Sequence, residues 1–186
     1  MNVKAYLKIK VIKDGKCIYY RRYRSKSFVG NYILSLNHDL ADVNLTLVNT
    51  SGATFGTGLG NSSLNVRDAG NDDSFGIQIG AGTTAPAITD YRLTQLIPNG
   101  IGPGQMQYQG VNVFSPVINT SNNTGYFTVA RAFTNNSGGS ITVSEVGLVA
   151  SYFGQYVLII HDLLPTPITV PNGSTLSIAY EIQVAT

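Results

Sequence analysis

The chain has few of the residues on which catalytic, disulfide-rich and highly charged domains depend. Its 186 residues include one cysteine, two histidines, two glutamates and no tryptophan. The single cysteine, Cys17, excludes an intramolecular disulfide, so stability must come from a buried core, from assembly, or from both. Charged residues make up only 12% of the chain, against roughly 25% in ordinary globular domains. Much of the surface must therefore be neutral, which suits burial against further copies of the same chain.

Catalytic and metal-binding patterns are equally sparse. His161-Asp162 ends an apolar segment, which favours a structural strand end over a catalytic pair. A glycine-rich run at residues 56–60 lacks the strand–loop–helix context and the Lys-Ser/Thr ending of a phosphate-binding loop. One cluster offers carboxylate oxygens that could hold Ca²⁺, although it lacks the ligand order of an EF-hand: Asp68, Asp72 and Asp73. We expect no enzyme and no cofactor, with Ca²⁺ at this cluster as the alternative.

Long apolar runs are also missing. No stretch approaches the ~18 apolar residues of a membrane helix. Residues 1–10 lack the apolar run and small-residue cleavage site of a secretory signal. We therefore expect no membrane partner.

Charge is divided unevenly along the chain. Residues 1–26 hold nine of the twelve basic groups and one acid, Asp14, which gives +8, whereas the remainder holds three bases and nine acids, which gives −6. A segment of this charge is expected to seek an acidic partner, either nucleic acid or the acidic body of a neighbouring subunit. The alternative is a solvated face on a two-stranded ribbon.

The basic segment has the pattern of a β-hairpin followed by a short helix. Apolar residues alternate with Lys and Tyr over residues 3–11, and Asp14-Gly15 supplies a turn to a tyrosine-rich strand at residues 17–24. Ser27 could cap the helix. The apolar residues at helical spacing are Phe28, Tyr32, Ile33, Leu36 and Leu40. Because so short a helix is unstable alone, it must pack on a sheet or on a partner.

After Val43, β-prone segments alternate with Gly, Asn, Ser and Pro at intervals of about ten residues, as in sandwiches and barrels. Strands are expected at residues 45–48, 63–67, 75–79, 107–114, 125–134, 141–150, 156–162 and 175–184, and a loop at 51–61. The predicted fold class is an all-β antiparallel sandwich, of jelly-roll or Greek-key type, with an N-terminal β-hairpin and one short α-helix. We divide the chain into a basic assembly arm at residues 1–43 and a β-sandwich body at residues 44–186.

Several segments follow one another in a recognisable order. They are residues 25–31 after the charged hairpin, then 75–86 with 90–93, then 133–138, 143–148 and 170–176. In this order they resemble small virion structural proteins of tailed bacteriophages and related metagenomic viruses. The resemblance implies a capsid-decoration, tail or fibre/adaptor component of a virion assembled in the host cytoplasm. It also implies other virion proteins as partners, and no catalytic residues.

Charge and resemblance together predict self-assembly through the arm. Its strands could extend the sheet of a neighbouring copy, and its helix could dock there. Such a contact, repeated head to tail, closes a ring or builds a filament. The predicted interface residues are Lys8, Lys10, Tyr19, Arg21, Arg22, Tyr23, Arg24, Phe28 and Tyr32.

Three other functions stay open. An extracellular filament or surface-layer subunit would share the assembly physics but would need export. A carbohydrate- or receptor-binding jelly roll predicts a surface patch lined by Tyr and Asp. A basic arm that meets packaged nucleic acid predicts steeply salt-dependent DNA binding, and is less favoured than a contact with a neighbouring subunit.

Overall fold

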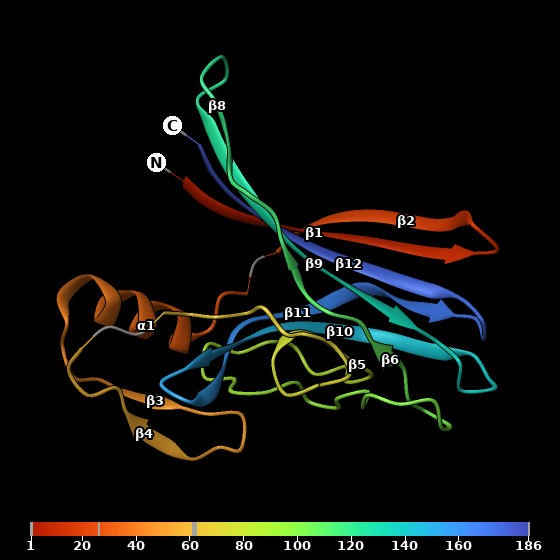
Figure 1. Ribbon diagram of the computed structural model, residues 1–186, viewed down its shortest axis with the longest axis horizontal. Coiled ribbons are helices and arrows are strands. Elements are labelled where there is room, and N and C mark those ends of the chain that lie inside the picture. The colour runs from red at the N-terminus through yellow and green to blue at the C-terminus, as the bar shows by residue number, and fades with distance from the viewer. Residues whose placement is uncertain (1, 26, 61–62, 186) are drawn as a thin grey trace.

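The protein is an antiparallel sandwich of two unequal sheets, with one helix at its side (Figure 1). The computed structural model describes residues 2–25, 27–60 and 63–185. The predicted fold class, an all-β sandwich with an N-terminal hairpin and one short helix, is confirmed.

The larger sheet contains both ends of the chain. Its strands are β1 (Asn2–Lys13), β2 (Lys16–Ser25), β6 (Gln107–Tyr108), β7 (Asn112–Val113), β8 (Val117–Asn119), β9 (Thr124–Thr134) and β12 (Thr175–Ala185). The order is β2-β1-β12-β9-β6, and β7 and β8 also pair with β9. β1 is antiparallel to β12 from the pair Asn2 and Ala185 to the pair Ile12 and Thr175. The hairpin is thus continuous with the sheet of its own subunit.

The smaller sheet has the order β11-β10-β5. Its strands are β5 (Gly76–Gly80), β10 (Ile141–Tyr152) and β11 (Gln155–Val170). The large sheet covers one face, and the loops of residues 81–106 pack against the other (Figure 1). β11 continues well past residue 162, where the sequence predicted its end. It tolerates Pro165 and Pro167 because it is an edge strand.

One apolar core joins the two sheets. On β1 the buried residues Ala5, Leu7, Ile9 and Val11 alternate with side chains on the outer face. Leu176 and other residues of β12 continue the same buried row. Asp14 and Gly15 have φ angles of 48° and 73°, the left-handed pair that a two-residue type I′ turn requires. The alternation and the turn predicted for the hairpin are therefore both present.

The helix α1 (Gly30–Ala41) and a small hairpin of β3 (Thr46–Val48) and β4 (Thr54–Gly56) lie together at one end of the sandwich (Figure 1). β4 falls in the segment predicted to be a loop. The strand predicted at residues 63–67 is reduced to one bridge between Asn65 and Ser151. The N-cap of α1 is Val29 and not Ser27, whose carbonyl accepts the backbone N–H of His161.

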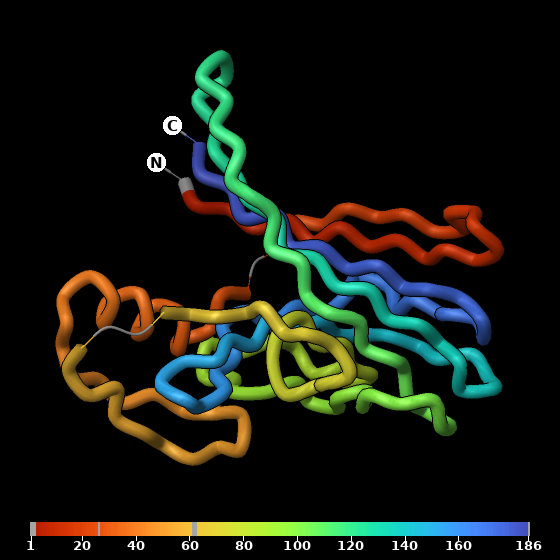
Figure 2. The backbone as a smooth tube through the Cα atoms, in the orientation of Figure 1, coloured from red at the N-terminus to blue at the C-terminus, as the bar shows by residue number. Residues whose placement is uncertain are grey.

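A wing projects from the sandwich, formed by residues 2–5, 117–119, 124–127 and 182–185 of the large sheet (Figure 2). Here the central strands extend beyond the smaller sheet, and both chain ends lie side by side. Val3, Val117 and Ile118 of the wing are exposed. In the wing, therefore, the smaller sheet does not cover the large sheet, and these apolar side chains are exposed to solvent.

Candidate assembly surfaces

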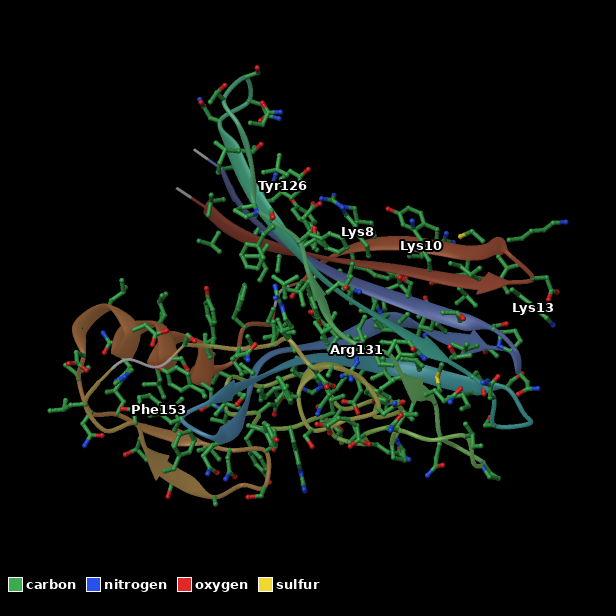
Figure 3. The ribbon with its side chains drawn as sticks, in the orientation of Figure 1. Lys8, Lys10, Lys13, Tyr126, Arg131 and Phe153 are labelled. Atoms are coloured by element: carbon green, nitrogen blue, oxygen red, sulfur yellow. The ribbon has the colours of Figure 1, made fainter. Side chains whose placement is uncertain are left out.

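The nine residues predicted for the assembly interface lie on both faces of the β1–β2 hairpin and just after it. Those on the outer face, turned away from the smaller sheet, are Lys8, Lys10, Arg22 and Arg24. Those on the opposite face are Tyr19, Arg21 and Tyr23, and those that follow the hairpin are Phe28 and Tyr32. Figure 3 shows Lys8 and Lys10 along the outer side of β1. The structure therefore brings only part of the set together on one surface.

On the outer face, Glu181 of β12 neutralises part of the basic stripe. Lys8 Nζ lies 2.5 Å from Glu181 Oε2, and Arg22 Nη2 lies 3.2 Å from Glu181 Oε1. The Arg22 guanidinium also stacks on the ring of Tyr6, 3.6 Å from its centroid. Burial raises the pKa of Glu181, but the hydrogen bonds from Lys8 and Arg22 outweigh burial and hold the pKa below its ordinary value. Lys8 and Arg22 are thus engaged within the subunit.

Other cations of the hairpin remain available. Within the part of the chain that the structure describes, no acid pairs with Lys4, Lys10 or Arg24. Lys10 lies over the ring of Tyr20, 5.7 Å from its centroid. Lys10 and Arg24 are exposed and Lys4 is half-buried, and all three lie where a neighbouring molecule could meet them.

The four predicted aromatic residues pack mainly inside the subunit. Tyr19 and Tyr23 are half-buried against the core, with hydroxyls 3.1 Å apart. Burial and the contact with Tyr19 raise the pKa of Tyr23 to about 12. The rings of Phe28 and Tyr32 have centroids 4.4 Å apart and also pack against the core. Only their exposed edges are free for a neighbour.

The most deeply buried residues of α1 are polar, and Tyr32 and Leu34 pack partly buried against the core beside them. The buried residues of the helix are Asn31, Ser35 and His38. Asn31 Nδ2 donates to Val48 O at 2.8 Å, and Val48 N donates to Asn31 Oδ1 at 3.2 Å. The ring nitrogens of His38 lie 2.7 Å from Val43 O and 3.2 Å from Gly60 O. These bonds fix the rotation of the helix about its axis.

The outer face of α1 is apolar. Ile33, Leu36 and Leu40 are 60%, 37% and 79% exposed. Leu59 is exposed as well. The predicted stripe is divided in the single subunit, because Phe28 and Tyr32 pack against the core while Ile33, Leu36 and Leu40 face solvent. Asn31, Ser35 and His38 share one helical face, at i, i+4 and i+7, but this spacing did not predict that the polar face would turn inward.

An apolar groove of about 520 Å³ opens beside α1 and under the wing. Phe127 and Ile182 line it from the wing, and Tyr32 lines it from the helix. Leu64 and Val66 form part of its other wall. Arg67 lies at the groove, and Lys4 and Arg24 line a neighbouring hollow with Phe28. The groove is therefore apolar inside and basic around it.

In the acidic cluster considered for Ca²⁺, the side chain of Asp68 pairs with a buried arginine. Arg131, labelled in Figure 3, is fully buried and pairs with Asp68. Its other bonds go to the carbonyls of Gln109, Phe75, Ile77 and Asp72. The side chains of Asp72 and Asp73 accept the backbone N–H groups of Ser74 and Asn99. An arginine within the buried alternation of residues 127–133 was the sequence signal for such a paired charge.

A second buried cluster joins β10, β11 and the covering loops. Glu145 accepts the backbone N–H groups of Gly82, Thr94 and Gln95, and its Oε2 lies 2.9 Å from His161 Nε2. His161 Nδ1 lies 2.7 Å from Asp90 Oδ2. Because Glu145 and His161 are buried and fully bonded, the arrangement holds the loops onto the sheet and offers no surface to a substrate.

No helix in the described residues is long and apolar enough to span a membrane. Over the same residues, no group of three or more His, Cys, Asp or Glu side chains converges as metal ligands.

Comparison with known proteins gives no relative on which to base a function. No protein-family model, curated protein or solved structure matches the chain.

Proposed function

We propose that the protein is a structural subunit that assembles with copies of itself through the apolar face of α1. The observation that carries the proposal is the polarity of this helix, which buries Asn31, Ser35 and His38 and exposes Ile33, Leu36 and Leu40. A surface helix normally shows the opposite arrangement. The hydrogen bonds of the inner face prevent the helix from rotating to hide its apolar residues, so a partner has to cover them.

The spacing of the three apolar residues suits a groove. Positions 33, 36 and 40 correspond to i, i+3 and i+7, the anchors of a helix that lies in an apolar groove. The groove under the wing has such a lining. The helix carries Asp39 and ends at Asp42, with no lysine or arginine between residues 30 and 42, whereas Arg67 lies at the groove and Lys4 and Arg24 lie near it. Charge complementarity thus makes the groove of a second copy the occupant that we propose for the helix.

The typical free energies of apolar burial and of ion pairing indicate which of the two dominates the proposed association. Full burial of a Leu or Ile side chain contributes about 1.5–3 kcal/mol, so three of them contribute several. An exposed ion pair contributes about 0–1 kcal/mol. The apolar face of α1 therefore supplies most of the association energy, and the basic residues near the groove supply orientation and partner choice.

The proposed setting is a virion, as a capsid-decoration, tail or fibre component. The support for this setting is the resemblance of residues 75–86, 143–148 and 170–176 and the neighbouring segments named above. An extracellular filament or surface-layer subunit would use the same contact. Detection of the chain in purified virus particles distinguishes the two.

The assembly proposal is tested by the molar mass of the intact chain in solution. We expect the wild-type protein to exceed the subunit mass of 19.9 kDa in light scattering, and the double variant Leu36→Ser/Leu40→Ser to return to it. Ile101→Ser is the matched control, because Ile101 is 61% exposed but lies outside the helix. A wild-type chain that stays at the subunit mass at its highest soluble concentration would overturn the proposal.

A further inference from the structure

A polar cleft of about 450 Å³ lies on the loop-covered side of the smaller sheet and shares no lining residue with the groove beside α1. The residues that line it are Thr50, Asp73, Ser74, Gln78, Arg92, Leu93, Thr94, Leu96 and Tyr156. A volume of this size accommodates a small organic molecule of one or two rings. The assembly contact proposed above uses none of these side chains.

The cleft contains a buried amide whose orientation is fixed. Gln78 is only 5% exposed, and its Nε2 donates to Asp73 O at 2.5 Å and Ser74 O at 3.3 Å. Both amide hydrogens are thereby directed to the protein. No described residue donates to Gln78 Oε1, which is left to accept a hydrogen bond from the cleft. This oxygen is not one of the buried, unpartnered polar atoms among the described residues, so it is open to the cleft and can be reached there by a ligand or by water.

Charged groups of both signs face the same space. Asp73 uses Oδ2 to accept the backbone N–H of Asn99 at 2.7 Å, and its other oxygen has no partner among the described residues. Arg92 stacks on Tyr91, with 5.4 Å between the guanidinium and the ring centroid, and forms no ion pair or hydrogen bond within the described part of the chain. The cleft thus combines hydrogen-bond acceptors on Gln78 and Asp73 with hydrogen-bond donors on Arg92.

One wall of the cleft is aromatic and rigid. Tyr156 is exposed, and its ring is stacked on Phe75 with centroids 5.4 Å apart and planes 8° from parallel. The stack fixes the plane of the tyrosine ring. A fixed aromatic face can pack against the apolar C–H face of a flat ligand.

We propose that this cleft binds a saccharide of one or two rings. Sugar hydroxyls donate and accept at adjacent positions, which matches Asp73 and Gln78 as acceptors and Arg92 as donor. The C–H face of the sugar packs on Tyr156. The carboxylate of Asp73 disfavours a phosphate ligand, and the apolar floor of Leu93 and Leu96 is too small for a lipid chain. The inference does not depend on self-assembly, although several copies held together would strengthen weak binding through avidity.

The test is saturation-transfer NMR on the intact chain with defined probes, namely the methyl glycosides of glucose, galactose, mannose, N-acetylglucosamine, glucuronic acid and N-acetylneuraminic acid. We expect at least one probe to bind, and Arg92→Ala and Asp73→Asn each to weaken that binding by about tenfold or more. Tyr156→Ala should abolish it, whereas Tyr126→Ala, on the outer face of the large sheet, should leave it unchanged.

Arg92→Ala keeps the test decisive if Tyr156→Ala fails to fold, because Arg92 is exposed and forms no ion pair or hydrogen bond with any described residue. Failure of all six probes to bind the wild type would overturn the inference, as would equal binding by wild type and folded Arg92→Ala. Leu36→Ser/Leu40→Ser should retain the binding of single subunits, so the two proposals fail independently.

Discussion

Asn31 of α1 bonds both backbone groups of Val48 in β3, donating from Nδ2 to the carbonyl and accepting the N–H at Oδ1. This pair ties the helix to the β3–β4 hairpin by its polar side. The apolar side, with Leu36 and Leu40, is thereby held toward solvent. The structure thus presents the proposed contact surface at a fixed angle.

Replacing Asn31 should destabilise this end of the molecule. Asn31→Ala leaves the N–H and carbonyl of Val48 without these bonds, for which we expect a loss of about 1–3 kcal/mol in the free energy of unfolding. Urea denaturation followed by circular dichroism measures it. Asn37→Ala, an exposed asparagine in the same helix, is the control. Equal effects of the two substitutions would show that the bonds to Val48 do not hold the helix.

Arg131 should be among the most sensitive positions of the chain. Arg131→Met removes its hydrogen bonds to four carbonyls and leaves Asp68 buried without its cation, so we expect a loss of about 3–5 kcal/mol. Arg131→Lys should not restore the stability, because lysine lacks the planar fork of donors. Guanidinium denaturation provides the measurement, with exposed Arg67→Met as the control. A loss below that of Arg67→Met would contradict the assigned role.

The buried cluster of His161 and Glu145 predicts a stability maximum in pH. Burial lowers the pKa of His161, but bonds to Glu145 and Asp90 outweigh it and raise the pKa above 6.5. Its contribution is complete below pH 6.5 and is lost as pH rises through the folded-state pKa. Burial raises the pKa of Glu145, but bonds from His161, Gln95 and Thr94 outweigh it and lower the pKa below 4.5. That contribution is present above pH 4.5 and is lost as pH falls through the lowered pKa.

Thermal melting as a function of pH tests this cluster. We expect the melting temperature of the wild type to fall on both sides of the maximum. His161→Gln should melt lower overall and lose most of the decline above pH 6.5, because no imidazolium remains to be deprotonated. A variant that kept the full alkaline decline would assign it to other groups.

Charge reversal near the groove should weaken assembly without unfolding the subunit. Arg24 is exposed and has no acidic partner within the described residues, so Arg24→Glu should raise the dissociation constant between copies several-fold. Lys16→Glu makes the same charge change at the hairpin turn and should have little effect. Sedimentation velocity gives both constants. Identical values would indicate that net charge alone matters.

Local patterns in the sequence predicted the helices and strands better than they predicted the contacts between those elements. The alternation from Ala5 to Val11 and the Asp14-Gly15 turn depend on neighbouring residues only, and both are present. The segment at residues 107–114 reads as one strand, but the chain forms β6 and β7, because Gly110 packs against the backbone of Ala69 between them. That contact exists only in the folded chain.

The candidate surfaces depended on such distant contacts even more. Helical spacing showed that Leu36 and Leu40 share a face, but not that carbonyls of residues 43 and 48 would draw the opposite face inward. The cleft likewise combines Gln78, Arg92 and Tyr156 from three separate segments. Composition indicated neutral surface and uneven charge, yet neither places an interface on a particular helix.

Burial of the α1 face between copies can be measured most directly by thiol labelling. In the Cys17→Ser chain, Leu40→Cys places the only thiol on this face, and Ile101→Cys is the control. We predict that maleimide reacts with the thiol at position 40 much more slowly in concentrated, assembled protein than in dilute protein, while the thiol at position 101 reacts at the same rate in both. Equally fast labelling of the two thiols in the assembled sample would contradict the proposed interface.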